Sequence, residues 1–274
     1  MDLAQSQSQT KRDRPSALIS ASAAGLAITL IVAALCFFVD RINGQKWRAR
    51  PVRRLSELRL KTGDLLLFSG RSFEPVPTVS FIIKLVTNSD ISHVGLVWQD
   101  PLTQLLWVWH TAGVPKSSRS AYPPASPGSR HHAHLMRLEE AINPRYGRVY
   151  VRPCSHELNT YRMAEFIRPN LGRHYSFDIA LHFYNRTWGF APLHFLETEE
   201  GKSGATAAAD TAPAASAKWS CAEMIIYCLV HMGVMPSSEL AVAHNYLPKD
   251  FSSSNFLRLT GDISYGREFR IELD

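Results

Sequence analysis

Residues 91–111, ISHVGLVWQDPLTQLLWVWHT, decide the fold of this chain. Two apolar runs that contain β-branched and aromatic residues, 93–98 and 105–111, flank a polar segment at 99–104. That segment contains an Asp-Pro pair, which is typical of a turn. The pattern predicts a β-hairpin whose two strands pair across the turn.

The predicted hairpin brings two histidines together. His93 opens the first strand directly after Ser92, and His110 lies on the second strand. If the strands pair across 99–104, both rings lie near the same end of the hairpin and can face one side of the sheet. Two half-buried histidines with purely structural hydrogen bonds would give the same pattern, so the spacing alone leaves both interpretations open.

The rest of the chain supplies further elements of an α+β fold. Residues 65–68 follow a Gly-Asp pair and are typical of a buried strand, whereas 116–134 are rich in Ser, Pro and His and favour a surface loop. We expect a disordered insertion at 201–218, because this Ala/Thr/Ser/Gly run cannot bury enough apolar surface to offset its ordering entropy. The other predicted elements are an amphipathic segment at 81–86, strands at 148–152 and 269–273, and helices at 156–168, which stops at Pro169, and at 177–187.

The clearest helix begins beside a cysteine. Residues 220–232 repeat an apolar face at helical spacing, and Gly233 follows as a C-cap. Cys221 lies at the start of this helix, where the helix dipole lowers the pKa of a thiol and favours the nucleophilic thiolate. Cys228, two turns further on, is better explained as a small buried apolar residue, which is the common fate of a free cysteine.

The cysteines and the remaining histidines do not predict a metal or a disulfide scaffold. Cys221 and Cys228 are about two helical turns apart, which disfavours a mutual disulfide, and no CxxC pair indicates zinc. The usage favours free thiols in a reducing compartment. The histidines at 131, 132 and 134 lie in the predicted loop and are expected to be solvated, with a metal site there as the alternative. No cofactor is predicted.

Residues 17–39 contain no charged residue over 23 positions. As a helix this run would be about 34 Å long, enough to cross a hydrocarbon core of about 30 Å. We therefore expect a transmembrane signal anchor at 17–39, after a disordered N-terminus at 1–16 and before a basic linker at 40–54. A cleaved signal peptide and a buried core helix are the alternatives. The heavier basic flank follows the segment, which predicts a single-pass membrane protein with a cytosolic catalytic domain.

The net charge of +6 is confined to the N-terminal region. Residues 1–60 hold ten Lys and Arg against four Asp and Glu, and the remainder holds twenty of each sign. A neutral body without a basic stripe argues against nucleic acid as a partner. A basic flank beside an apolar run fits the anionic headgroups of a lipid bilayer better.

Three short motifs resemble those of a known family. They are TGDLLLF at 62–68, ISHVGLV at 91–97 and WSCAE at 219–223. In this order they resemble the circularly permuted NlpC-type papain-like cysteine hydrolases, which include YiiX-like proteins and, more distantly, the lecithin retinol acyltransferase group. The resemblance covers residues 58–272, with histidine before cysteine, the reverse of ordinary papain-like enzymes. It implies one domain at 55–274, with an antiparallel sheet packed against the helix that carries the cysteine.

The resemblance also implies roles for individual residues. It implies Cys221 as nucleophile, His93 as its base and His110 as the third member, a place that His, Glu, Asp or Asn fills in the family. The stretch 172–178 resembles a Gly-x-x-Tyr-x-x-Asp motif of the family, and Tyr175 is carried over as a substrate contact. This chain has Ser-Cys-Ala-Glu where the acyltransferase branch has Asn-Cys-Glu, so membership of that branch is not implied.

Together these observations predict a membrane-anchored thiol hydrolase or acyltransferase that cleaves an amide, ester or thioester bond, with a small-molecule, lipid or peptide substrate. His93 would take the Cys221 proton, His110 would hold the ring tautomer, and N–H groups at the helix start would stabilise the oxyanion. The alternatives are a peptidase or isopeptide amidase of the same fold, a catalytically inactive membrane-tethered binding module, and a structural membrane protein. An apolar groove beside Cys221 would favour a lipid substrate, and an open polar cleft a peptide.

Overall fold

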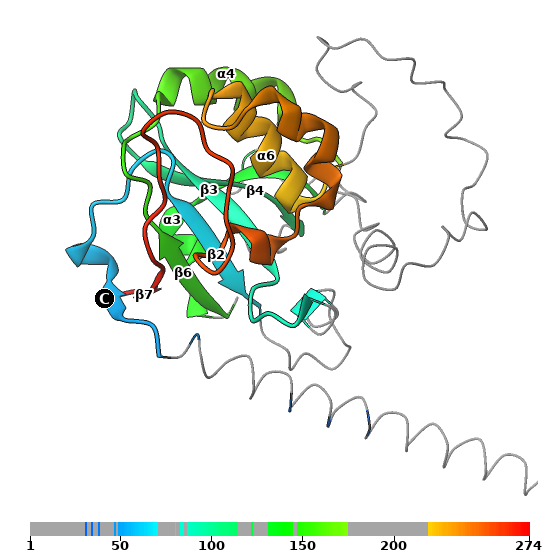
Figure 1. Ribbon diagram of the computed structural model, residues 1–274. Coiled ribbons are helices and arrows are strands. Elements are labelled where there is room, and N and C mark those ends of the chain that lie inside the picture. The colour runs from blue at the N-terminus through cyan, green and yellow to red at the C-terminus, as the bar shows by residue number, and fades with distance from the viewer. Residues whose placement is uncertain are drawn as a thin grey trace, which may run out of the picture.

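The computed structural model describes residues 31, 34, 38, 47, 49–70, 80, 83–84, 87–113, 122, 131–144, 147–174 and 219–274. Its centre is a seven-stranded sheet in the order β1-β7-β6-β2-β3-β4-β5 (Figure 1). β1 pairs with β7 in parallel, and every other neighbouring pair is antiparallel. The strands are β1 (Val52–Arg54), β2 (Leu65–Ser69), β3 (His93–Gln99), β4 (Leu106–Gly113), β5 (His131–Arg137), β6 (Arg148–Arg152) and β7 (Phe269–Glu272).

The sheet is therefore mixed, and the prediction of an antiparallel sheet is wrong at the β1 edge. The parallel pair matches Val52 with Arg270 and Arg54 with Glu272, so it joins the two ends of the folded part. All three residues of β1 are exposed. A short, exposed and basic strand has no apolar alternation, which explains why these residues were expected to belong to a linker rather than to the sheet.

The predicted membrane-spanning helix is not supported. Within the described part of the chain, no helix combines the length and the apolar character needed to cross a membrane. This finding contradicts the prediction of a transmembrane anchor and of a single-pass membrane protein. All but three positions of the segment 17–39 lie outside the described residues.

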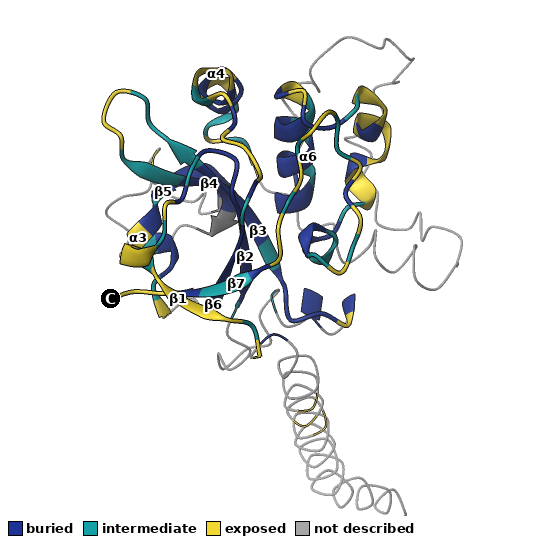
Figure 2. Ribbon diagram, turned by 60° about the vertical axis from the view of Figure 1, so that its left-hand side comes forward, coloured by how far each residue is buried: buried dark blue, intermediate teal, exposed yellow. Residues whose placement is uncertain are grey.

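The sheet buries apolar side chains on both faces, because successive residues of a strand point to opposite sides. One face packs against α6 (Cys221–His231), which lies on β3 and β4, and against α4 (Thr160–Asn170). The other face packs against the short helix α3 (Leu138–Ala141) (Figure 2). Strands β2 to β5 contribute Leu65, Leu67, Val94 and Leu96 to the α6 face, and Leu66, Val97, Val108 and Met136 to the α3 face.

The hairpin and the cysteine helix form as predicted. β3 and β4 pair antiparallel from Leu96 opposite Trp109 to Gln99 opposite Leu106, which confirms the hairpin. The helix α6 begins at Cys221. The helix α4 begins later than the sequence predicts, because the Asn159 side chain accepts hydrogen bonds from the backbone N–H groups of the first helical turn and so sets its start.

Strand β5 begins inside the segment 116–134 that was predicted to be a surface loop. It pairs with β4 over its whole length, with His134 opposite His110. Ala133 and Leu135 are buried on the α6 face, whereas Met136 is buried on the α3 face, so the segment alternates as a strand. The predicted helix at 177–187 and the insertion at 201–218 lie outside the described residues, as do most positions of 81–86.

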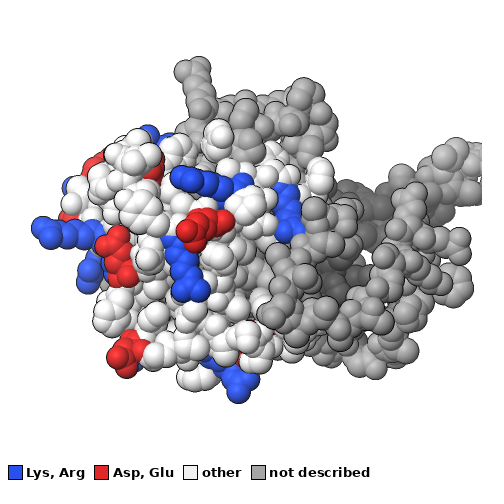
Figure 3. Space-filling model, turned by 90° about the horizontal axis from the view of Figure 1, so that it is seen from above, with Lys and Arg blue, Asp and Glu red and all other residues white. Residues whose placement is uncertain are grey.

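The remaining elements are short 3₁₀ helices. η1 (Leu55–Glu57) follows β1, and η5 (Ser237–Asn245) and η6 (Pro248–Phe251) connect α6 with β7. η5 packs against α6 and helps to hold it on the sheet. On the face that Figure 3 shows, the charged side chains of both signs are interspersed.

Candidate functional site

Cys221 is the first residue of α6 and is completely buried. A capping box fixes this end of the helix. The Ser220 hydroxyl accepts a hydrogen bond from the N–H of Glu223 at 3.1 Å, and the Glu223 carboxylate accepts one from the N–H of Ser220 at 2.7 Å. The box leaves the N–H groups of Cys221 and Ala222 without a side-chain cap, and both approach the Cys221 sulfur as donors.

A third donor to the sulfur comes from the sheet. It is the backbone N–H of Val94, the residue that follows His93 on β3. Burial raises the pKa of the Cys221 thiol to about 11, and the negative charge of Glu223 acts in the same direction, while the three N–H donors lower it by less. The resting group is therefore a thiol. Burial outweighs the helix-start effect from which the sequence predicts a lowered pKa.

The two predicted histidines form a hydrogen-bonded pair. Nε2 of His93 lies 3.0 Å from Nδ1 of His110. Burial, reinforced by the neighbouring His134, lowers the pKa of His93 to about 3. Burial and the other histidines hold the pKa of His110 well below its usual value. Both rings are consequently neutral near pH 7, and a neutral imidazole is the form that can accept a proton.

Two neighbouring residues of strand β3 point to opposite sides of the sheet, Val94 toward the thiol and His93 toward the face that carries Phe68. Val94 packs with Cys221 on the α6 face, whereas His93 turns its ring toward Phe68 and His110. Within the described residues, the hydrogen bond of the His93 ring is to His110 and not to the Cys221 sulfur. The structure thus assembles the predicted pair and places the thiol beside the next residue of the same strand. Tyr175, the predicted substrate contact, lies outside the described residues.

A glycine makes room for the histidine pair. A Cβ added to Gly95 would come within 2.8 Å of Val108 Cγ1 and 3.3 Å of His110 Cβ. A distance of 2.8 Å is shorter than side-chain carbons adopt, so position 95 has no space for a side chain unless its neighbours move. The glycine of the Ser-His-Val-Gly motif therefore has a packing role beside His110.

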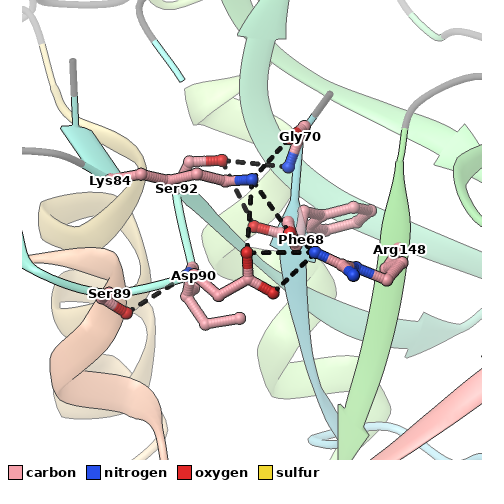
Figure 4. Close-up of polar contacts among 9 residues, drawn as sticks. Phe68, Gly70, Lys84, Ser89, Asp90, Ser92 and Arg148 are labelled. Carbon is pink, nitrogen blue, oxygen red and sulfur yellow. Dashed lines mark hydrogen bonds and ion pairs between the residues drawn. The ribbon is translucent and has the colours of Figure 1, made fainter. Parts of the chain in front are cut away.

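A buried ionic network fixes the loop that leads into β3 (Figure 4). The Asp90 carboxylate is fully buried and lies 3.1 Å from the Arg148 guanidinium of β6 and 3.4 Å from the Lys84 ammonium. Lys84, itself buried, donates to the Gly70 carbonyl at 2.6 Å and to the Ser69 hydroxyl at 3.0 Å. Asp90 thus holds two cations of distant segments on one carboxylate, three residues before His93.

Ser92 extends this network to the start of β3. Its N–H donates to the Phe68 carbonyl at 2.9 Å, and its hydroxyl accepts from the N–H of Gly70 at 3.2 Å. These bonds fasten the residue before His93 to the end of β2 (Figure 4). Local sequence patterns do not reveal this network, because its partners are contributed by three separate segments.

Two further histidines extend the pair. His134 and His132 are buried on β5, and the His134 ring lies 4.3 Å from that of His110 and 5.4 Å from that of His132, between centroids. The prediction that these histidines are solvated is wrong, because β5 brings them into the sheet. Alternation of apolar residues across 132–136 was the signal that could have placed them. We call His93, His110, His134 and His132 the histidine row.

The described residues around the site do not form a metal centre. Among the described residues, no group of three or more His, Cys, Asp or Glu side chains could hold a metal ion. A cavity of about 430 Å³ lies at the β1–β7 edge and is lined in part by Arg50, Arg53 and Glu268. None of its lining residues belongs to the predicted site.

Comparisons with known proteins give only distant similarity in fold. No family model matches the chain, and no curated protein matches it. Among solved structures, the chain is similar to the metalloprotein YiiX from Escherichia coli O157:H7, with 20% sequence identity and a TM-score of 0.32. The similarity covers 48% of this chain and 69% of that chain. At this level it says nothing about activity.

Proposed function

We propose that the protein is a cysteine hydrolase that cleaves an amide, ester or thioester bond, with Cys221 as nucleophile, His93 as base and His110 orienting the base. The 3.0 Å hydrogen bond between His93 Nε2 and His110 Nδ1 carries the proposal. It leaves Nδ1 of His93 as the nitrogen that can serve a thiol. A nucleophile, a base and a third group that orients the base are what this kind of catalysis requires.

The proposed reaction begins when Nδ1 of His93 accepts the thiol proton of Cys221. The sulfur then attacks the carbonyl carbon, and N–H groups at the start of α6 donate to the oxyanion of the tetrahedral intermediate. When the intermediate collapses, the leaving group takes the proton from His93 and an acyl thioester remains on the sulfur. A water molecule, deprotonated by the same imidazole, attacks the thioester and releases a carboxylic acid.

The directions of the pKa shifts favour proton transfer during attack over a preformed ion pair. Burial keeps the Cys221 pKa above its usual value and the His93 pKa below its usual value. The thiol and the imidazole are therefore both neutral at rest. His93 would act as a general base at the moment of attack.

One observation favours a second candidate, a binding module of this fold without activity. The Cys221 thiol is fully buried, and among the described residues the ring of the proposed base is hydrogen-bonded to His110 and not to the sulfur. A relative that had lost its activity would keep the fold and could show the same enclosed thiol. Acylation of Cys221 distinguishes the two candidates.

The test is acylation of the full chain by p-nitrophenyl acetate, followed by intact mass and peptide mapping. We expect one acetyl group on Cys221, none on the Cys221→Ala protein, and acylation slowed about 100-fold or more by His93→Gln. Cys228→Ala is the matched control, since Cys228 is a buried thiol of the same helix, and it should acylate normally. Equal rates in the wild-type and His93→Gln proteins would support the binding module.

A further inference from the structure

Two ring nitrogens in the histidine row are buried without a partner. They are Nε2 of His110 and Nε2 of His134, and neither has a hydrogen bond within the described residues. The two rings are in contact, with centroids 4.3 Å apart and planes inclined by 52°. A buried nitrogen without a partner lowers the stability of the folded state, so the positions of the protons on these two rings affect its free energy.

The tautomer of His134 follows from its one hydrogen bond. Nδ1 of His134 lies 2.9 Å from the backbone carbonyl of His132. A carbonyl oxygen only accepts, so Nδ1 carries the proton. Burial lowers the pKa of His134 to about 4, although the nearby Glu140 acts in the opposite direction, and the ring is neutral near pH 7. Nε2 of His134 therefore presents a lone pair.

This lone pair discriminates between the two tautomers of His110. With its proton on Nδ1, His110 would bury a second lone pair next to that of His134, and neither Nε2 would have a donor among the described residues. With its proton on Nε2, His110 presents a donor on a ring whose centroid lies 4.3 Å from that of His134. The second tautomer avoids burying two lone pairs on neighbouring rings.

The choice at His110 determines the state of His93. When Nε2 of His110 is protonated, its Nδ1 is an acceptor, so His93 must donate from Nε2 across the 3.0 Å contact. A neutral His93 that is protonated on Nε2 has its lone pair on Nδ1. This is the nitrogen that the proposed reaction uses as base.

We propose that His134 is a positioning residue that sets the tautomers of His110 and, through it, of His93. In this arrangement His93 donates from Nε2 to His110, His110 carries its proton on Nε2, and His134 donates from Nδ1 to the His132 carbonyl. When Nδ1 of His93 takes the thiol proton, no other proton moves, and the resulting imidazolium still donates to His110. The role of His93 as a base rests on the proposed function, whereas the tautomers of the three rings do not depend on it.

The test is ¹⁵N NMR of the histidine rings in the full chain, which distinguishes protonated from unprotonated ring nitrogens. We expect His134 to be protonated on Nδ1, and His110 and His93 on Nε2. His134→Phe keeps a flat ring but removes the acceptor, and it should leave His110 and His93 as mixtures of both tautomers. His134→Gln places an amide oxygen near the Nε2 position and should restore the wild-type tautomers.

Two results would overturn the inference. The first is a wild-type protein in which His134 is protonated on Nε2. This measurement uses no variant, so it tests the inference even if His134→Phe does not fold. The second is an unchanged His110 tautomer in a folded His134→Phe or His134→Leu protein. Either leaves the proposed function standing if Cys221 acylation still depends on His93. If the tautomers are as expected but acylation of Cys221 does not depend on His93, the proposed function is wrong and the role of His134 in setting the tautomers still stands.

Discussion

Gly95 on β3 lies against His110 on β4 so closely that a Cβ at position 95 would come within 3.3 Å of the His110 Cβ. The same atom would lie 2.8 Å from Val108 Cγ1. Because His110 holds His93 by a hydrogen bond, a methyl group at position 95 would act on the candidate base through its neighbour. The close packing at Gly95 therefore affects the position of the candidate base.

We expect Gly95→Ala to destabilise the protein by about 1 to 3 kcal/mol, the usual range for an overpacked core. The strain arises because Val108 and His110 must move, which should also slow acylation of Cys221. Urea denaturation measures the first effect and acetylation by p-nitrophenyl acetate the second. Val108→Ala is the matched partner, since it removes the nearest atom. It should cost less in the Gly95→Ala background than in the wild type, and strict additivity would refute the clash.

Asp90→Asn should be among the most destabilising single substitutions, at about 3 to 5 kcal/mol, because it removes a buried carboxylate from an ionic network. Lys84 and Arg148 would both lose the ion pair that they share with Asp90. Chemical denaturation measures the loss. The control is Asp100→Asn in the β3–β4 turn, where an amide oxygen can still accept from the Leu102 N–H. A cost for Asp90→Asn no greater than that of the control would show that the network contributes little.

Stability should fall as the pH is lowered from about 6.5. The pKa values of His93, His110 and His134 are lower in the folded protein than in the unfolded chain, so the unfolded chain binds more protons below that pH. Each ring contributes a slope of about 1.4 kcal/mol per pH unit, down to about pH 4 for His134 and about pH 3 for His93.

Urea denaturation at pH 7.5 and pH 5.0 measures this slope. His134→Gln removes one of the titrating rings and should reduce the slope, whereas His156→Gln, at an exposed histidine, should leave it unchanged. A stability that is flat between these two pH values would mean that the row is already protonated in the folded state.

Glu223→Gln should make Cys221 more acidic. The negative charge of Glu223 contributes to the raised pKa of the thiol, while an amide oxygen can still accept from the Ser220 N–H and keep the capping box. The alkylation rate of Cys221 against pH, followed by peptide mapping, should therefore shift to lower pH. Glu165→Gln on the exposed side of α4 is the control. An unchanged profile would show that the Glu223 charge does not contribute to this pKa.

Local patterns were sufficient to predict the elements that carry the candidate site. The hairpin follows from two apolar runs around a turn, and α6 follows from its apolar face and from Gly233. Strand β5 escaped prediction because Ser, Pro and His dominate the segment around it, although the alternation is present. Strand β1 could not be predicted, since three exposed residues become a strand only by pairing with β7.

Some features of the candidate site could likewise be predicted from the sequence, and others could not. His93 and His110 could be paired from the hairpin register, because their relation is local. The raised pKa of Cys221 could not be predicted, since it depends on how completely the sheet and the helix enclose the sulfur. The Lys84–Asp90–Arg148 network is likewise a product of tertiary structure, because its members come from separate segments.

The burial of Cys221 determines when its sulfur can be oxidised by peroxide. Peroxide reacts with thiolates and needs access to the sulfur. A sulfur that is completely buried, with a pKa of about 11, offers neither while the protein is idle. In the reaction that we propose, oxidation to sulfenic acid would be confined to the moments when His93 withdraws the proton. Inactivation by peroxide should therefore follow turnover and proceed faster with substrate present than without it.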